Sequence, residues 1–97
     1  MPNIEIRGFE KYKAENLKRA IDRAMQGIGL QHDAVTSVMP MEVTTCDGRS
    51  IKTPYLRVCS TETAEIRMIL DALRSAGVRE DVEYLVLDGF IPASKMG

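Results

Sequence analysis

The chain has 97 residues, of which 44% are hydrophobic and 28% charged, and its formal net charge is −1. This length is typical of one domain, so we treat residues 1–97 as a single domain. The near-neutral charge argues against a nucleic-acid partner, which a basic surface would favour. No apolar run approaches the roughly 20 residues that span a membrane, and no secretory signal opens the chain, so we expect a cytoplasmic protein.

The first elements expected along the chain are a strand and a helix. Residues 2–7 alternate apolar and polar side chains, as a half-buried strand does. From about Lys11 to Met25, apolar residues recur at helical spacing. Gly27 and Gly29 mark the end of this helix, because glycine accepts the left-handed conformation found there.

A second strand is expected within residues 36–45, followed by a turn and a third strand. Three apolar residues of the second strand share one face, namely Met39, Met41 and Val43. Pro40 interrupts this stretch, which indicates an edge strand or a bulge, since proline donates no ladder hydrogen bond. Asp47-Gly48 is the strongest turn signal of the chain. The third strand, Tyr55 to Ser60, places Leu56 and Val58 on one face and Tyr55, Arg57 and Cys59 on the other.

The second half of the chain predicts another helix and a last strand. Ser60 or Thr61 is expected as the N-cap of the helix, and Gly77 as its end. The apolar stripe of this helix consists of Ile66, Ile69, Leu70 and Leu73. The last strand, Val82 to Leu87, is almost entirely apolar, which is typical of a central strand covered on both faces. A short tail from Phe90 to Gly97 exposes apolar residues, namely Phe90-Ile91-Pro92, unless something covers them.

The apolar stripe of the first helix matches that of the second at one constant offset in the sequence, and each helix stands between two strands. The elements therefore form two β-α-β repeats. Crossovers of this kind are right-handed, which predicts an α+β domain with a four-stranded mixed sheet and both helices on one face. The other face must be wet or covered by a partner. Two architectures satisfy this description, the tautomerase fold and the ferredoxin-like fold. They differ in strand order, which periodicity does not decide.

Pro2 stands directly before the first strand and is the main candidate for chemistry. Removal of Met1 would expose a secondary amine at the start of a folded strand. Such α-amino groups titrate at about 7.7–8.0 and can act as general bases near neutral pH. The alternative is that Pro2 only begins a strand, which proline tolerates. If Met1 stays attached, the nitrogen is a tertiary amide and has no basicity.

In layout the whole chain resembles the tautomerase superfamily, which includes 4-oxalocrotonate tautomerase and macrophage migration inhibitory factor. The matching features are Met1-Pro2 before an alternating strand, a first helix of about four turns, Thr36-Ser37-Val38 and the repeated β-α-β unit. The resemblance implies a trimer-type assembly around a central channel. It also implies a processed proline that acts as general base on α-keto or enol acids, with cationic side chains as helpers and no metal or organic cofactor.

The cationic helpers are less well matched than Pro2. Met39 stands where 4-oxalocrotonate tautomerase has an arginine, which puts the known substrates of the family in doubt. The candidates for binding a substrate carboxylate are Lys11, Lys13, Arg49, Lys52 and Arg57, and the family's aromatic position in the last strand corresponds best to Tyr84. Solvated surface charge is the alternative for each lysine and for Arg49. Arg57 stands out, because its expected face of the sheet is free of helices.

The functional expectation is therefore a tautomerase-like protein in which Pro2 transfers protons on a small α-keto or enol acid. The alternative is a non-catalytic binding or oligomerisation module of the same fold, since a fold alone does not confer activity. Cys46 and Cys59 are expected as free thiols in a chain without a signal peptide. His32 is expected as a surface loop residue, because no partner for a metal site stands near it in the sequence.

Overall fold

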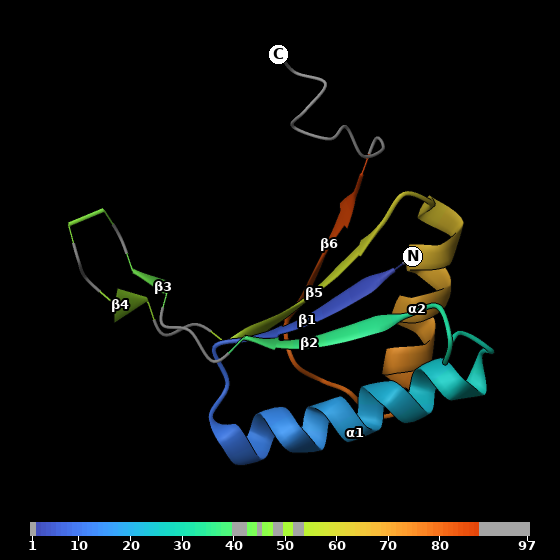
Figure 1. Ribbon diagram of the computed structural model, residues 1–97, viewed down its shortest axis with the longest axis horizontal. Coiled ribbons are helices and arrows are strands. Elements are labelled where there is room, and N and C mark those ends of the chain that lie inside the picture. The colour runs from blue at the N-terminus through green and yellow to red at the C-terminus, as the bar shows by residue number, and fades with distance from the viewer. Residues whose placement is uncertain (1, 40–42, 45, 48–49, 52–53, 88–97) are drawn as a thin grey trace.

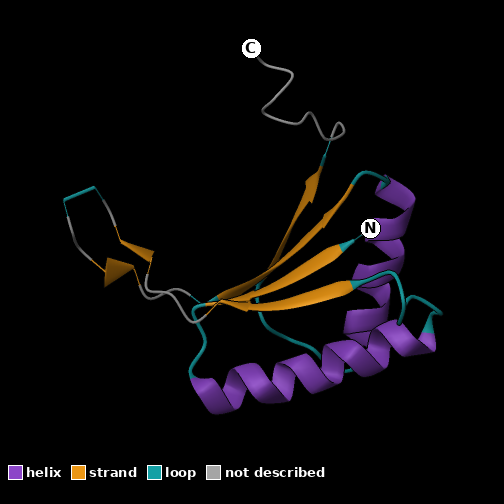
Figure 2. Ribbon diagram, in the orientation of Figure 1, coloured by secondary structure: helices purple, strands orange, loops and turns teal. Residues whose placement is uncertain are grey.

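Four strands form one mixed sheet, and two helices cover one of its faces (Figures 1 and 2). The computed structural model describes residues 2–39, 43–44, 46–47, 50–51 and 54–87. The elements are β1 (Asn3–Arg7), α1 (Lys11–Gly27), β2 (Val35–Met39), β3 (Val43–Thr44), β4 (Ser50–Ile51), β5 (Tyr55–Ser60), α2 (Thr63–Ser75) and β6 (Val82–Val86). The expected α+β class with both helices on one face is confirmed.

The strand order is β2-β1-β5-β6, with β1 parallel to β2, β5 parallel to β6, and β1 antiparallel to β5. Each β-α-β unit therefore keeps its two strands side by side, and the two units meet at the β1–β5 pair. A ferredoxin-like sheet splits each unit by inserting a strand of the other. The observed order has no such interleaving, so the ferredoxin-like alternative is wrong.

The core lies between the helices and the sheet, where alternate strand residues meet one stripe of each helix. The sheet contributes Ile4, Ile6, Leu56 and Val58, and the helices contribute Ala14, Leu17, Ile21, Met25, Ile66, Ile69 and Leu73. These residues are the ones that the period-2 and helical patterns place on the inner faces. Burying this set removes apolar surface from water, which is the main favourable contribution to folding.

The start of α2 differs from the expected N-cap. The helix begins at Thr63 after Glu62, which makes no side-chain capping hydrogen bond. Ser60 is instead the buried last residue of β5. Its hydroxyl accepts a 3.1 Å hydrogen bond from the Glu62 N–H and donates a 2.7 Å hydrogen bond to Glu65. Ser60 thus stabilises the strand-to-helix connection from outside the helix, because its backbone still pairs with β6 as the last residue of β5.

The expected second strand is two separate strands. β2 ends at Met39, and β3 pairs with β4 in a two-stranded hairpin that projects from the body (Figure 1). Met39 and Val43 therefore belong to different sheets. The turn expected at Asp47 is confirmed, whereas Pro40, Met41 and Gly48 lie outside the described residues.

The position of β6 corrects the expectation of a central last strand. Among the strands of the described residues, β6 pairs only with β5 and forms one edge of the sheet (Figure 1). Consequently Tyr84, Leu85, Val86 and Leu87 are all exposed, with 57% of Tyr84 accessible. A strand has the same apolar sequence pattern whether the protein's own helices or another molecule cover it. The pattern of residues 82–87 therefore did not distinguish a central strand from an edge strand. The apolar tail expected after Gly89 lies outside the described residues.

Neither helix is long and apolar enough to cross a membrane within the described part of the chain.

Candidate functional site on the helix-free face of the sheet

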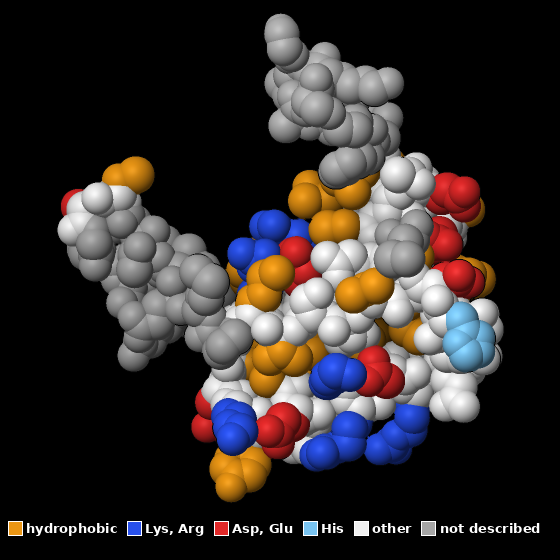
Figure 3. Space-filling view, viewed as in Figure 1, with side chains coloured by type: hydrophobic (Ala, Val, Ile, Leu, Met, Phe, Trp, Pro, Cys, Tyr) orange, Lys and Arg blue, Asp and Glu red, His pale blue; other side chains and the backbone are white. Residues whose placement is uncertain are grey.

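The side chains opposite the helices form the most chemically varied face of the molecule. Because strand side chains alternate, burial of Ile4 and Leu56 in the core places their neighbours on the helix-free face. These neighbours include Asn3, Glu5 and Arg7 on β1, and Tyr55, Arg57 and Cys59 on β5. The expected orientation of Arg57 is therefore confirmed. Figure 3 shows basic and acidic side chains gathered over the sheet between the hairpin and β6.

Five residues of this face make one connected cluster, which we call the Arg57 cluster: Glu5, Arg7, Tyr55, Arg57 and Glu83. Nη1 of Arg7 lies 2.9 Å from Oε1 of Glu5, and Nη1 of Arg57 lies 3.8 Å from the same oxygen. Arg57 donates through Nε to Glu83 and through Nη2 to the Tyr55 hydroxyl at 3.2 Å. Both guanidinium carbons lie within 6 Å of the Tyr55 ring centre, which is cation–π distance. The buried carboxylate of Glu5 is therefore shared by Arg7 and Arg57.

The electrostatics of the cluster favour the charged form of Arg57. Its hydrogen bond to Glu83 is the main reason that the pKa of Arg57 is raised above its ordinary value, with smaller contributions from Tyr55 and Glu5. The two arginines and two glutamates balance in charge, so an external carboxylate must compete with an internal one. Glu83 is the replaceable partner, because half of its side chain is exposed, whereas Glu5 is 11% exposed.

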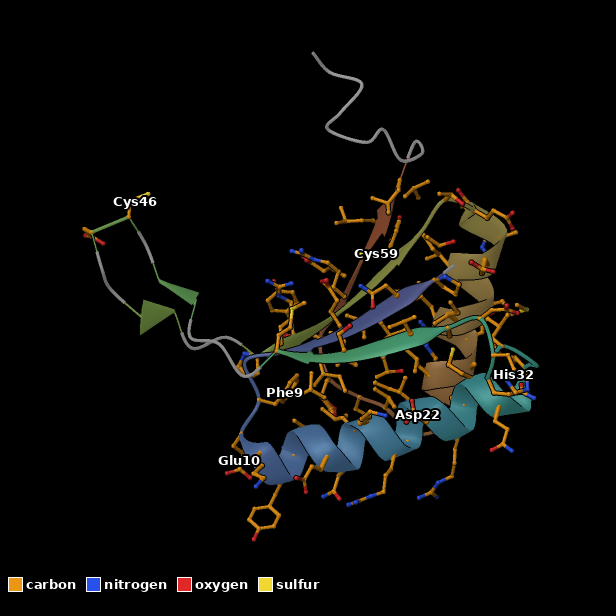
Figure 4. The ribbon with its side chains drawn as sticks, viewed as in Figure 1. Phe9, Glu10, Asp22, His32, Cys46 and Cys59 are labelled. Atoms are coloured by element: carbon orange, nitrogen blue, oxygen red, sulfur yellow. The ribbon has the colours of Figure 1, made fainter. Side chains whose placement is uncertain are left out.

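Cys59 lies at the margin of this cluster and is nearly inaccessible. Register places it opposite Asn3 and beside Leu85. Burial raises the pKa of the Cys59 thiol, and the negative charge of Glu5 raises it further, while Arg57 opposes the shift. The reactive form of cysteine is the thiolate, so Cys59 is chemically inert at neutral pH. Cys46 is exposed at the tip of the hairpin (Figure 4), and both cysteines are free, as expected.

We expect the two thiols to react at very different rates with an aromatic disulfide reagent at pH 8. Cys46 should react in a fast phase, and Cys59 only as quickly as the sheet opens or unfolds. Absorbance of the released thiolate, followed with and without urea, measures both phases. Cys46→Ser should abolish the fast phase and leave the slow one. A fast phase that survives Cys46→Ser would contradict the buried, protonated state of Cys59.

Pro2 is fixed at the head of the central strand β1, on the other face of the sheet. Its carbonyl accepts a 2.9 Å hydrogen bond from the Val35 N–H. Its side chain is fully buried and alternates in phase with Ile4, so it faces the core. Arg57 pairs with Glu5, three residues along the strand from Pro2, which corresponds to about 10 Å at 3.4 Å per residue. One chain therefore does not bring Pro2 and Arg57 together.

The other predicted site residues are dispersed. Lys11 and Lys13 are exposed at the start of α1, beyond the opposite end of β1 from Pro2, and Lys13 pairs with Glu80 at 3.1 Å. Tyr84 lies on β6 beside an open groove of about 560 Å³ between this strand and α2. His32 is exposed in the turn after α1 (Figure 4), as expected. Arg49 and Lys52 lie outside the described residues.

Four cluster members were not singled out in the sequence, namely Glu5, Arg7, Tyr55 and Glu83. Alternation alone places the first three on the helix-free face. What the sequence lacks is the register that sets Glu5 opposite Arg57 and Arg57 opposite Glu83. Among the described residues, no three histidine, cysteine, aspartate or glutamate side chains converge as a metal site would require.

Comparisons with known proteins support the fold and leave the activity open. No model of a known protein family matches the sequence, and no curated protein matches it. Among solved structures, the chain is similar to the crystal structure of a domain of unknown function, DUF1904, from Sebaldella termitidis, with a TM-score of 0.58 and 14% sequence identity. The similarity covers 90% of this chain and 89% of that chain. At this identity the likeness extends to the fold alone.

Proposed function

We propose that the chain, once Met1 is removed, is a tautomerase-like protein in which the Pro2 amine is the general base. The observation that carries the proposal is the position of Pro2 at the head of a central strand, where its carbonyl is held by the Val35 N–H. A base of this kind must be positioned as well as basic. The side-by-side β-α-β units agree with the tautomerase alternative of the two architectures.

The Arg57 cluster is the proposed carboxylate site. A substrate carboxylate would replace Glu83 on Arg57, and the same guanidinium would stabilise negative charge on an enolate oxygen. Because Arg57 lies about 10 Å along the sheet from Pro2 and on the other face, an arginine from another copy must approach Pro2. The trimer-type assembly implied by the tautomerase resemblance would supply it, and small α-keto or enol acids are the proposed substrates.

A non-catalytic binding or oligomerisation module is the rival proposal. Two observations favour it: the Pro2 side chain is fully buried, and the arginines of the cluster already have carboxylate partners. In this reading Pro2 is a core residue and the cluster stabilises the sheet. The chain would then promote no reaction whether or not Met1 is removed.

Ketonisation of phenylenolpyruvate separates the two proposals. We expect the processed chain to accelerate the reaction, and a chain that carries a residue before Pro2 to lose at least 100-fold, because general bases contribute about 10²–10⁴. Arg57→Gln should raise KM more than it lowers kcat if the arginine holds the carboxylate. Arg23→Gln, an exposed change on α1, is the matched control and should leave both constants unchanged.

Intact mass must establish the state of Met1 in every sample, and circular dichroism must show that each variant is folded. No rate above buffer for a folded, processed chain would remove the catalytic proposal. Equal rates for the processed and extended chains would also remove it, because the extended chain has no amine at Pro2.

A further inference from the structure

The free edge of β6 is the largest run of exposed apolar side chains in the described part of the chain. Tyr84 and Val86 point toward the helix side of the sheet, and Leu85 and Leu87 toward the helix-free side. Figure 3 shows hydrophobic side chains at this edge. Natural proteins protect such an edge with charges, prolines or bulges, because an open strand pairs with other chains. Between residues 82 and 87 only Glu83 is charged.

Among the residues that the structure describes, the backbone of β6 has unpaired hydrogen-bonding groups on the side away from β5, where another strand could pair with it. The Leu87 N–H donates to the Ser60 carbonyl at 2.9 Å, and the Asp81 carbonyl accepts from the Leu56 N–H at 2.8 Å. The backbone groups of the odd-numbered residues therefore point to β5. Because these groups alternate along a strand, the N–H and C=O of Val82, Tyr84 and Val86 point to the free edge. Such unpaired groups form a template for strand addition.

The charges near the edge permit a second copy of the same strand. Glu83 is already bound by Arg57 of its own chain, which compensates part of its charge and so weakens the repulsion between two copies. A second groove on the helix side of β6, next to the one described above, is lined by Arg67, Asp71 and Arg74 as well as Tyr84. A second copy that docks on β6 would therefore meet both positive and negative side chains in this groove.

We propose that two copies of the chain pair through β6 in an antiparallel, two-fold arrangement centred on Leu85. In this register Tyr84 exchanges hydrogen bonds with Val86 of the other copy, and the two Leu85 side chains face each other. The two Glu83 carboxylates then lie about 13 Å apart, four residues along the strand. A register centred on Tyr84 would bring them within about 7 Å, so the remaining repulsion disfavours Tyr84 as the centre. The contact is independent of the Pro2 chemistry.

Disulfide cross-linking tests the register with two almost equally exposed residues on the same face, Leu85 at 44% and Leu87 at 46%. Both are changed to cysteine in a background with Cys46→Ser and Cys59→Ala, so that no other thiol competes. Leu85→Cys should form a covalent dimer under mild oxidation, because directly opposed side chains lie within disulfide reach. Leu87→Cys should not, since its copies are about 13 Å apart along the strand. Equal cross-linking of the two variants, or none for Leu85→Cys, overturns the proposal.

The assembly mass provides a second measurement on the unmodified chain. Val86→Pro removes one outward N–H without touching the ladder to β5, and proline is tolerated on edge strands. Light scattering should show that Val86→Pro halves the mass of the assembly while circular dichroism shows a folded domain. A monomeric wild-type chain, or an assembly whose mass does not change in folded Val86→Pro, overturns the contact.

Discussion

Ile69→Ala should lower the free energy of unfolding by about 3–4 kcal/mol, because deleting a buried aliphatic side chain removes its transfer free energy and leaves a cavity. Ile69 is 0% exposed and lies on the stripe of α2 that packs against the sheet. Domains of this size have about 5–15 kcal/mol in total, so the variant should lose a large fraction of its stability. Urea denaturation measures the change.

The neighbouring residue provides the matched control for this prediction. Met68 stands one position earlier on α2 and is 41% exposed. Met68→Ala should lose less than about 1 kcal/mol, since surface substitutions rarely have large effects. Similar losses for both variants would show that α2 does not present the Ile69 face to the sheet.

Glu5→Gln should destabilise the fold by about 2 kcal/mol, although the change preserves the shape of the side chain. The substitution leaves Arg7 and Arg57 near one aromatic ring without the carboxylate that lies between them. Removing one partner of a fully buried pair costs about 3–5 kcal/mol, and the partial exposure of both arginines reduces that figure.

Glu83→Gln is the comparison for Glu5→Gln, because it removes a carboxylate from the same Arg57. We expect a loss below about 1 kcal/mol, since half of the Glu83 side chain is exposed and solvent screens the pair. Denaturation in low and high salt distinguishes the two, because the surface pair should weaken with salt more than the buried one. A larger loss for Glu83→Gln than for Glu5→Gln would contradict the central role of Glu5.

Local patterns predicted the elements of the fold well. The structure confirms the strands predicted from alternation in residues 2–7 and 55–60 and the helices predicted from their apolar stripes. These patterns depend only on residues that are close together in the sequence. The predictions were less accurate for the end of β2 at Met39, because the separate hairpin depends on pairing between β3 and β4. They were also less accurate for the start of α2 at Thr63, because the Ser60 hydroxyl binds the Glu62 N–H ahead of the helix instead of capping it.

Only part of the candidate site was accessible from the sequence. Arg57 was identified by its face, but its partners Glu5 and Glu83 come from two other strands, and register alone makes them neighbours. The apolar run of β6 was wrongly expected at the centre of the sheet, because the pattern of a fully apolar strand does not say whether it lies in the middle or at an edge. The roles of Pro2, Lys11, Lys13 and Tyr84 remain predictions, since nothing in a single chain brings them together.

The pairing of β1 with β5 has a consequence for how the chain folds. This pair joins Asn3 to Cys59 and Arg7 to Tyr55, residues about 50 positions apart, whereas each parallel pair joins the two ends of one β-α-β unit. Closing the longer loop has the higher entropic cost. We therefore expect each half to gather its own helix and strands early, and the joining of the halves along β1 and β5 to limit the rate at which the native sheet appears.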